Sequence, residues 1–404
     1  MAFLKKFFGG SYEDLWKAFI RPPRDEYDPS DLGPLEFRLQ HRTFTRTDLD
    51  LTNDRGLILK CSHFEPREDY RVAPQLPCVI YLHGNSSSRL EALAALPHLL
   101  PSNITVFCLD FSGSGKSEGE YISLGWFERD DLASVVTYLR SSGRTSCIGL
   151  WGRSMGAVTA LLHGDRDPSI AGMVIDSAFS SLHLLAEELA KNFAKVPKLL
   201  VSTALKLIRK SIKSRAKFDI NDLTPIEHVG QCFIPVLFAA GKEDNFILPS
   251  HTQALHERYA GDKSLALVDG DHNSPRPQFF LDSIGIFFYN TLQCSLLPDT
   301  RPRTEDSQVE DFDPGEYRFT RAMEFQEGLA EGEMTEEEMI AKAIEESLKQ
   351  GQAEDPYADL LSAGPTTEAD RKRVAEENAK LAQDLGLRAQ KPASTSTSTN
   401  LLDL

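Results

Sequence analysis

The pentapeptide Gly152-Arg-Ser-Met-Gly156 places a serine between two glycines, each two positions away. It follows the apolar run Ile148–Trp151, which is typical of a buried strand, and precedes an apolar helical pattern over Met155–His163. Glycines at these positions let a strand and a helix approach closely around a sharp turn, the nucleophile elbow, with the serine Oγ exposed at the helix N-terminus. We therefore predict that Ser154 is a nucleophile.

A serine hydroxyl needs a base to take its proton, and the base needs an acid to orient it. Around a nucleophile elbow these residues follow the serine in the order Asp or Glu, then His. Asp244 lies just after the strand-like run Pro235–Ala240, and His272 lies just after Leu265–Val268. We predict that Ser154, Asp244 and His272 form a catalytic triad.

Other residues compete for two of these roles. Asp176, at the end of the run Ala171–Ile175, is the alternative acid, because some hydrolases place the carboxylate one strand earlier. Among the other histidines, His163 closes a helical pattern and is interpreted as a favourable charge at a helix C-terminus. Three histidines on helical patterns are interpreted as surface residues: His98, His251 and His256.

Stabilising a developing oxyanion requires two backbone N–H donors. One is expected from Met155, the residue after the nucleophile. The other is expected from Asn85 in the segment His83-Gly-Asn-Ser86, which follows the apolar run Cys78–Leu82. His83 is expected to anchor this turn by a hydrogen bond.

The segment Asp110-Phe-Ser-Gly-Ser-Gly-Lys-Ser117 ends like a phosphate-binding loop. Such a loop requires a glycine five positions before Gly115, and Asp110 occupies that position. We interpret the segment as a glycine-rich turn at the rim of the site.

Short apolar runs alternate with helical patterns between residues 36 and 300, and the inner runs lack strict alternation. This predicts a mostly parallel, doubly wound α/β sheet with helices on both faces. We assign residues 1–35 to an N-terminal helical extension and 36–295 to the α/β domain. Residues from about 180 to 234 contain two helical patterns without a strand, which indicates a helical cap over the carboxyl edge, and its second, basic helix is expected to be a solvated face.

The chain has 404 residues and a net charge of −16, of which residues 301–404 contribute −12. This acidic balance argues against a nucleic-acid binder. We assign residues 296–404 to an acidic, largely disordered tail. The N-terminus lacks the features of a signal peptide, and no apolar run is long enough to span a membrane. We therefore expect a cytoplasmic protein. Its N-terminal segment Phe3-Leu-Lys-Lys-Phe-Phe8 could touch a membrane surface.

The six cysteines form no CxxC pair, and no two are closer than 17 residues. This spacing indicates neither a zinc site nor a dense disulfide framework. Buried thiols in a reducing compartment are the expected state of Cys78, Cys108 and Cys147, which lie in or at the start of strand-like runs. The predicted chemistry needs no metal and no organic cofactor.

The tail contains a second pattern. Over residues 336–349, an acidic cluster precedes a helical face that consists of Ile340, Ala343, Ile344, Ser347 and Leu348. Such a helix has too little apolar area to fold alone, so its face implies a partner. The short peptides Asp359-Leu-Leu361 and Leu401-Leu-Asp-Leu404 resemble adaptor-binding sequences.

Two family resemblances rest on these motifs. Residues ~36–295 resemble the α/β-hydrolase superfamily, in its serine aminopeptidase-like branch, through His83-Gly-Asn85, Asp110-x-x-Gly-x-Gly-x-Ser117, Gly152–Gly156, Asp244 and Gly270-Asp-His272. The resemblance implies the roles given above to Ser154, Asp244, His272, Met155 and Asn85.

Residues 336–349 resemble a ubiquitin-interacting motif. This implies that Ile340, Ala343, Ile344 and Ser347 contact ubiquitin, and that the protein is recruited to ubiquitinated or endocytic assemblies.

Two functions are compatible with the sequence. The first is a serine hydrolase that cleaves an ester, thioester or amide through an acyl-enzyme. The second is a non-catalytic ubiquitin-binding or endocytic adaptor that uses the hydrolase fold as a scaffold. Because every triad and oxyanion position is filled, the hydrolase is favoured.

Overall fold

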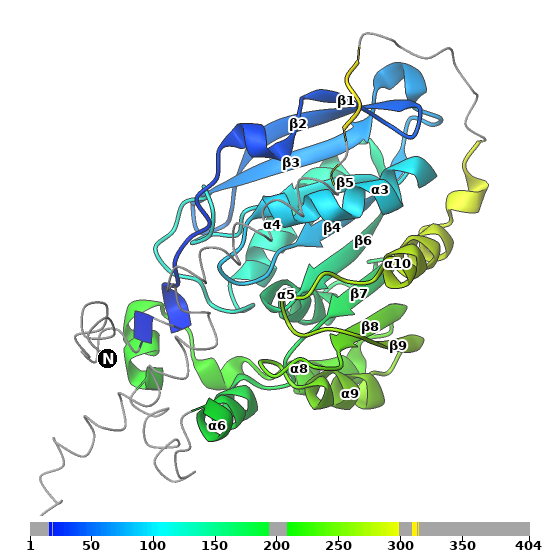
Figure 1. Ribbon diagram of the computed structural model, residues 1–404. Coiled ribbons are helices and arrows are strands. Elements are labelled where there is room, and N and C mark those ends of the chain that lie inside the picture. Colours follow the sequence, from blue (N-terminus) through cyan, green and yellow to red (C-terminus); the bar gives the residue numbers. More distant parts are fainter. Residues whose placement is uncertain (1–15, 18, 194–207, 299–308, 313, 315–404) are drawn as a thin grey trace, which may run out of the picture. The chain divides into compact units, whose positions relative to one another are not determined.

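The computed structural model describes residues 16, 17, 19–193, 208–298, 309–312 and 314. Nine strands of the described chain form one sheet in the order β1-β2-β3-β5-β4-β6-β7-β8-β9 (Figure 1). The pairs from β5 through β9 are parallel, whereas β1, β2 and β3 join the sheet in antiparallel fashion. The strands are β1 (Glu36–Leu39), β2 (Arg42–Thr52), β3 (Ile58–Pro66), β4 (Leu76–Leu82), β5 (Thr105–Leu109), β6 (Thr145–Arg153), β7 (Gly172–Asp176), β8 (Val236–Gly241) and β9 (Lys263–Val268).

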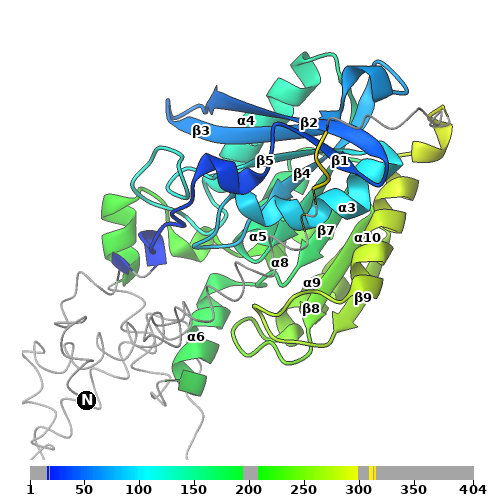
Figure 2. The ribbon, with the colours of Figure 1, turned by 45° about the horizontal axis from the view of Figure 1, so that its top comes forward.

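Helices cover both faces of the sheet (Figures 1 and 2). One layer contains α3 (Leu96–Leu99) and α10 (Gln278–Thr291), and the other contains α4 (Glu128–Ser141), α5 (Met155–Gly164) and α9 (Pro249–Arg258). Side chains of a central strand divide between the two layers, since successive side chains of a strand point to opposite faces. In β4, Val79 and Tyr81 pack with α3 and α10, whereas Ile80 and Leu82 pack with α4 and α5.

The predicted mostly parallel α/β sheet, doubly wound by helices, is confirmed, and each strand-like run named above corresponds to a strand. The strands β1 and β2 were not predicted. β2 carries charged and polar residues at most of its positions, and exposed residues alternate with partly buried ones in its second half, so it lacks the apolar run that marks the inner strands. Between β4 and β5 the chain forms 3₁₀ turns on both sides of α3, where Pro97 and Pro101 interrupt regular helix.

The segment between β7 and β8 contains no strand among its described residues. It includes α6 (Leu182–Phe193), a helical stretch over 208–215, and the short helix α8 (Pro225–His228) between two 3₁₀ turns, Ile220–Asp222 and Val229–Gln231. α6 lies apart from the two helical layers, at the lower left of Figure 1. On the basic helix, Arg209 and Lys213 both bind the carboxylate of Asp219.

Residues 309–312 differ from the sequence prediction, which placed them in a disordered tail. The Arg38 N–H donates to the Glu310 carbonyl, and the Phe312 N–H donates to the Arg38 carbonyl. The Arg38 guanidinium binds both carboxylate oxygens of Asp311, and the Phe312 ring packs edge-on against Phe37. The backbone hydrogen bonds to Arg38 and the contact of the Phe312 ring with Phe37 therefore attach this part of the tail to β1.

Candidate active site

Ser154 occupies a strained turn between β6 and α5. Its φ of 50° and ψ of −116° are unusual for a residue with a side chain. Sterics explain the flanking glycines, because a Cβ on Gly152 would collide with the Gly156 carbonyl and one on Gly156 with the Leu82 carbonyl. The Ser154 N–H donates to the Asp176 carbonyl at 2.8 Å, which fixes the turn to β7.

Ser154, His272 and Asp244 lie within hydrogen-bonding distance of one another in series. The Ser154 Oγ is 3.2 Å from His272 Nε2, and His272 Nδ1 is 2.8 Å from Asp244 Oδ2. Asp244 Oδ1 accepts hydrogen bonds from the backbone N–H groups of Phe246 and Ile247, so both carboxylate oxygens are engaged. With the acid at Nδ1, the ring presents its Nε2 lone pair to the serine hydroxyl.

Asp176, the alternative acid, is engaged elsewhere. Both of its carboxylate oxygens accept hydrogen bonds from Arg276, at 2.8 and 2.9 Å. Burial acts to raise the pKa of Asp176, but the Arg276 guanidinium outweighs it and holds the pKa below its ordinary value. Arg276 also donates to the carbonyls of Asp271 and Ser274, so this buried pair supports the loop that carries His272.

His83 anchors the turn after β4. Its Nε2 accepts from the Phe111 N–H at 3.1 Å, so the ring proton is on Nδ1, which donates to the Gly84 carbonyl at 2.6 Å. The expected structural role of His83 is thereby confirmed. The turn brings Asn85 to the same pocket as Ser154 and Met155.

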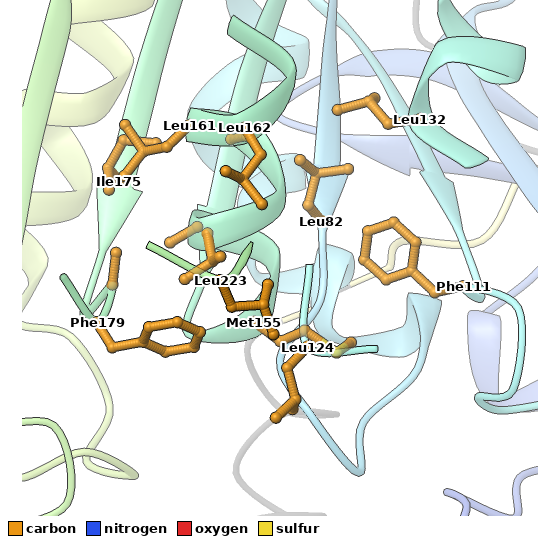
Figure 3. Close-up of a cluster of buried hydrophobic side chains, with 14 of the residues drawn as sticks. Leu82, Phe111, Leu124, Leu132, Met155, Leu161, Leu162, Ile175, Phe179 and Leu223 are labelled. Atoms are coloured by element: carbon orange, nitrogen blue, oxygen red, sulfur yellow. The ribbon is translucent and has the colours of Figure 1, made fainter. Parts of the chain in front are cut away.

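Apolar side chains line this pocket, with Ser154 and Asn85 as its polar members. The apolar members are Phe19, Leu124, Met155, Phe179, Leu182, Leu185, Ala186, Leu189, Phe246 and Ile247. Leu124, Met155 and Phe179 lie close together at one end of the buried cluster around α5 (Figure 3). The pocket wall is thus a continuation of the hydrophobic core, and its shape is set by core packing.

Two parts of the pocket wall are far from Ser154 in sequence. α6 supplies four of the lining residues, and Phe19 comes from the N-terminal segment. Phe19 is 2% exposed, and its neighbours Trp16 and Ile20 are also buried in the main core. The Arg24 guanidinium donates to the carbonyls of Ser117 and Gly119, which fastens the segment to the rim turn. The hydrophobic residues Trp16, Phe19 and Ile20 indicate that this segment is buried, but the sequence did not indicate that it would pack beside the Ser154 pocket.

Comparisons with known proteins agree with this architecture. Residues 74–226 match the family model described as Serine aminopeptidase, S33, a span that includes Ser154 and ends before Asp244 and His272. The uncharacterized protein YqkD of Bacillus subtilis is 31% identical over 209 residues, which cover 50% of this chain and 68% of that protein. The chain belongs to the α/β-hydrolase superfamily.

One further relative and one solved structure extend the comparison. The alpha/beta hydrolase domain-containing protein WAV2 of Arabidopsis thaliana is 29% identical over 182 residues, or 44% of this chain and 55% of that protein. The Pyrococcus furiosus esterase Pf2001 superposes with a TM-score of 0.51 at 23% identity, over 67% of this chain and 99% of that one. The latter similarity shows that the hydrolase fold is shared.

The protein contains a second Ser–His–acid series, in which Ser180 and His251 are buried and Glu188 is half-buried. The Ser180 Oγ is 2.7 Å from His251 Nδ1, and His251 Nε2 is 2.9 Å from the Glu188 carboxylate on α6. His251 is 1% exposed, so its interpretation as a surface residue was wrong. His163 is also buried, and burial lowers its pKa, which disfavours the charged form expected at the helix end.

Other predictions concern features away from the pocket. All six cysteines are free thiols, with Cys147 half-buried and the other five buried. Within the described residues, no group of three or more His, Cys, Asp or Glu side chains is arranged to hold a metal ion. No helix built from those residues has the length and apolar character needed to cross a bilayer. Ile340, Ala343, Ile344 and Ser347 lie outside the described residues.

Proposed function

We propose that the protein is a serine hydrolase that cleaves an acyl ester or thioester. The observation that carries this proposal is the hydrogen-bonded series Ser154–His272–Asp244, whose serine opens onto an apolar pocket. In this arrangement Asp244 orients His272, and His272 lies beside a serine at a sharp turn. General-base activation of a serine requires such an oriented base.

In the proposed reaction, Ser154 Oγ attacks the substrate carbonyl carbon while His272 Nε2 takes its proton. The backbone N–H groups of Met155 and Asn85 stabilise the oxyanion. The C–O or C–S bond to the leaving group then breaks, and the leaving group takes the proton from His272. Water next gives a proton to His272 and attacks the acyl-enzyme, which releases the acid and returns the proton to Ser154.

The pocket lining favours an uncharged, apolar acyl group. An aminopeptidase must bind the α-ammonium group of its substrate, and a carboxylate beside the scissile bond is the usual partner for such a charge. None of the residues that line the described pocket is Asp or Glu. We therefore favour an ester or thioester with an aliphatic acyl chain over an N-terminal peptide.

We further propose that the acidic tail recruits this hydrolase to ubiquitinated proteins in the cytosol, where endocytic adaptors could share the tail. The support is the sequence pattern of Ile340, Ala343, Ile344 and Ser347 behind an acidic cluster. Titration of ubiquitin into the full chain and into an Ala343→Asp variant tests this proposal, since binding that survives the substitution would contradict it.

Labelling of the full chain with a fluorophosphonate probe tests the hydrolase, beside the Ser154→Ala and His272→Ala variants. We expect the parent to be labelled and both variants to lose labelling, and the parent to hydrolyse p-nitrophenyl esters rather than aminoacyl nitroanilides. Ser180→Ala is the matched control and should remain labelled. A folded parent that neither labels nor hydrolyses any ester would overturn the proposal and favour the adaptor function.

A further inference from the structure

Glu91 lies between the loops that carry the proposed catalytic groups. It belongs to the 3₁₀ turn Arg89–Ala95 after the turn at Asn85. Its Oε2 accepts a hydrogen bond from the Gly84 N–H at 2.9 Å, and its Oε1 accepts one from the Tyr81 hydroxyl at 3.1 Å. The carboxylate therefore holds the backbone directly before Asn85, whose N–H is proposed to bind the oxyanion.

Arg153 connects the same carboxylate to the base. Its Nη1 is 3.6 Å from Glu91 Oε1, and its Nη2 donates to the His272 carbonyl at 2.6 Å. Arg153 occupies the position before the nucleophile, which the G-x-S-x-G pattern leaves open. One ion pair thus joins the oxyanion turn, the nucleophile elbow and the histidine loop.

We propose that Glu91 and Arg153 are positioning residues for the hydrolysis, an inference that rests on the proposed function. The two side chains are 15% and 17% exposed, so water screens their attraction only in part. Catalysis requires the oxyanion donor and the base to be placed within a fraction of an ångström, and a displacement of about 1 Å can reduce the rate on the order of a hundredfold. A charge pair that bridges both loops fixes them relative to each other.

The histidine loop has a second support, which makes the proposal testable. Arg276, anchored by Asp176, donates to the carbonyls on both sides of His272. The loop should therefore stay folded when Arg153 is replaced, so that the loss appears in the chemistry. Gln at position 91 can still accept a hydrogen bond from the Gly84 N–H, but it carries no negative charge to form the ion pair with the Arg153 guanidinium.

The experiment compares Glu91→Gln, Glu91→Ala, Arg153→Gln and the double variant Glu91→Gln/Arg153→Gln in the full chain. Arg140→Gln is the matched control, because it breaks an ion pair between the exposed Arg140 and Asp167, neither of which lines the pocket. Fluorophosphonate titration gives the active fraction, p-nitrophenyl butyrate gives kcat and KM, and an aliphatic trifluoromethyl ketone reports affinity for a tetrahedral adduct.

We expect kcat per labelled site to fall about tenfold in Glu91→Gln and on the order of a hundredfold in Glu91→Ala, with KM changed less than about threefold. Affinity for the ketone should fall in parallel with kcat. The double variant should be no slower than the slower single variant, since the two residues act as one unit.

An unchanged kcat per labelled site in Glu91→Ala and Arg153→Gln, with an active parent, would overturn the positioning role alone. Loss confined to the active fraction would do the same, because it would indicate a role only in folding. An inactive and unlabelled parent would instead overturn the proposed function and this inference together.

Discussion

The two Ser–His–acid series in this protein use nearly the same groups at similar distances. In the first, Ser154, His272 and Asp244 are linked at 3.2 and 2.8 Å. In the second, Ser180, His251 and Glu188 are linked at 2.7 and 2.9 Å. By distance alone, the second series is the tighter of the two.

The difference lies in the backbone and in the imidazole orientation. His251 Nδ1 accepts from both the Ser180 N–H and its hydroxyl, so its lone pair is already used, and Nε2 donates to Glu188. Ser154 is at a strained elbow and lines the pocket, whereas Ser180 is not among the residues that line it. Residue types and distances therefore do not suffice to define a nucleophilic serine. The serine must also line a pocket, and the histidine must have a lone pair that no other donor occupies.

The largest expected effect separates the two acids. Asp244→Asn should lower kcat on the order of 10⁴-fold, because an amide cannot stabilise the imidazolium or hold the required tautomer. Glu188→Gln should leave kcat within about threefold, since Gln retains an acceptor for His251 Nε2. Hydrolysis of p-nitrophenyl butyrate measures both. Equal losses in the two variants would show that the second series takes part in the chemistry.

A smaller effect concerns stability. His251→Ala removes the link between α6 and α9 and leaves buried partners unsatisfied, so the free energy of unfolding should fall by about 2–3 kcal/mol. Urea unfolding measures this loss, and His256→Ala on the same helix is the control. Because α6 forms one pocket wall, KM should rise more for octanoyl than for acetyl esters. A variant as stable as the parent would mean that this link does not support α6.

The smallest effect is a dependence of stability on pH. Burial lowers the pKa of His251, so below about pH 6.5 the unfolded chain binds a proton there that the folded chain resists. Stability should therefore decrease as the pH falls below that value, by at most about 1.4 kcal/mol per pH unit for this group.

His251→Gln should flatten this dependence, which urea unfolding between pH 7.5 and 5 would detect. Burial also lowers the pKa of His63, to about 4, and this group acts in the same direction. Since His63 remains in the variant, the slope should become smaller rather than disappear. An identical slope in parent and variant would assign the dependence to the carboxylates and to the other histidines whose pKa burial lowers, which include His63 and His163.

The sequence predicted those features that depend on local pattern. Gly152 and Gly156 mark a steric requirement within five residues, and Asp244 and His272 follow strands whose carboxyl ends meet at one edge of a parallel sheet. For that reason, residues more than 100 positions apart could be expected to lie together. The alternation of strand and helix likewise predicted a mostly parallel sheet, but it did not predict the reversed order β5-β4-β6 within that sheet.

The remaining features depend on tertiary pairing that no local pattern encodes. Glu91 lies on a turn and Arg153 at the end of a strand, and both are common residue types. The two residues pair with each other although they are 62 positions apart along the chain. The helix that carries His251 consists mostly of polar residues, so its sequence pattern resembled that of a surface helix. Phe19 becomes part of the pocket only because the N-terminal segment packs on the rim turn.

The pairing of residues 309–312 with β1 affects whether this edge of the sheet can pair with another molecule. β1 is an edge strand, and an edge strand presents unpaired N–H and C=O groups that can template pairing with another molecule. Glu310 and Phe312 use the main-chain groups of Arg38, and the Phe312 ring lies over Gly33, where a Cβ would collide with it. The chain thus covers its own sheet edge at Arg38, and we expect truncation before residue 309 to open that position to pairing with another molecule.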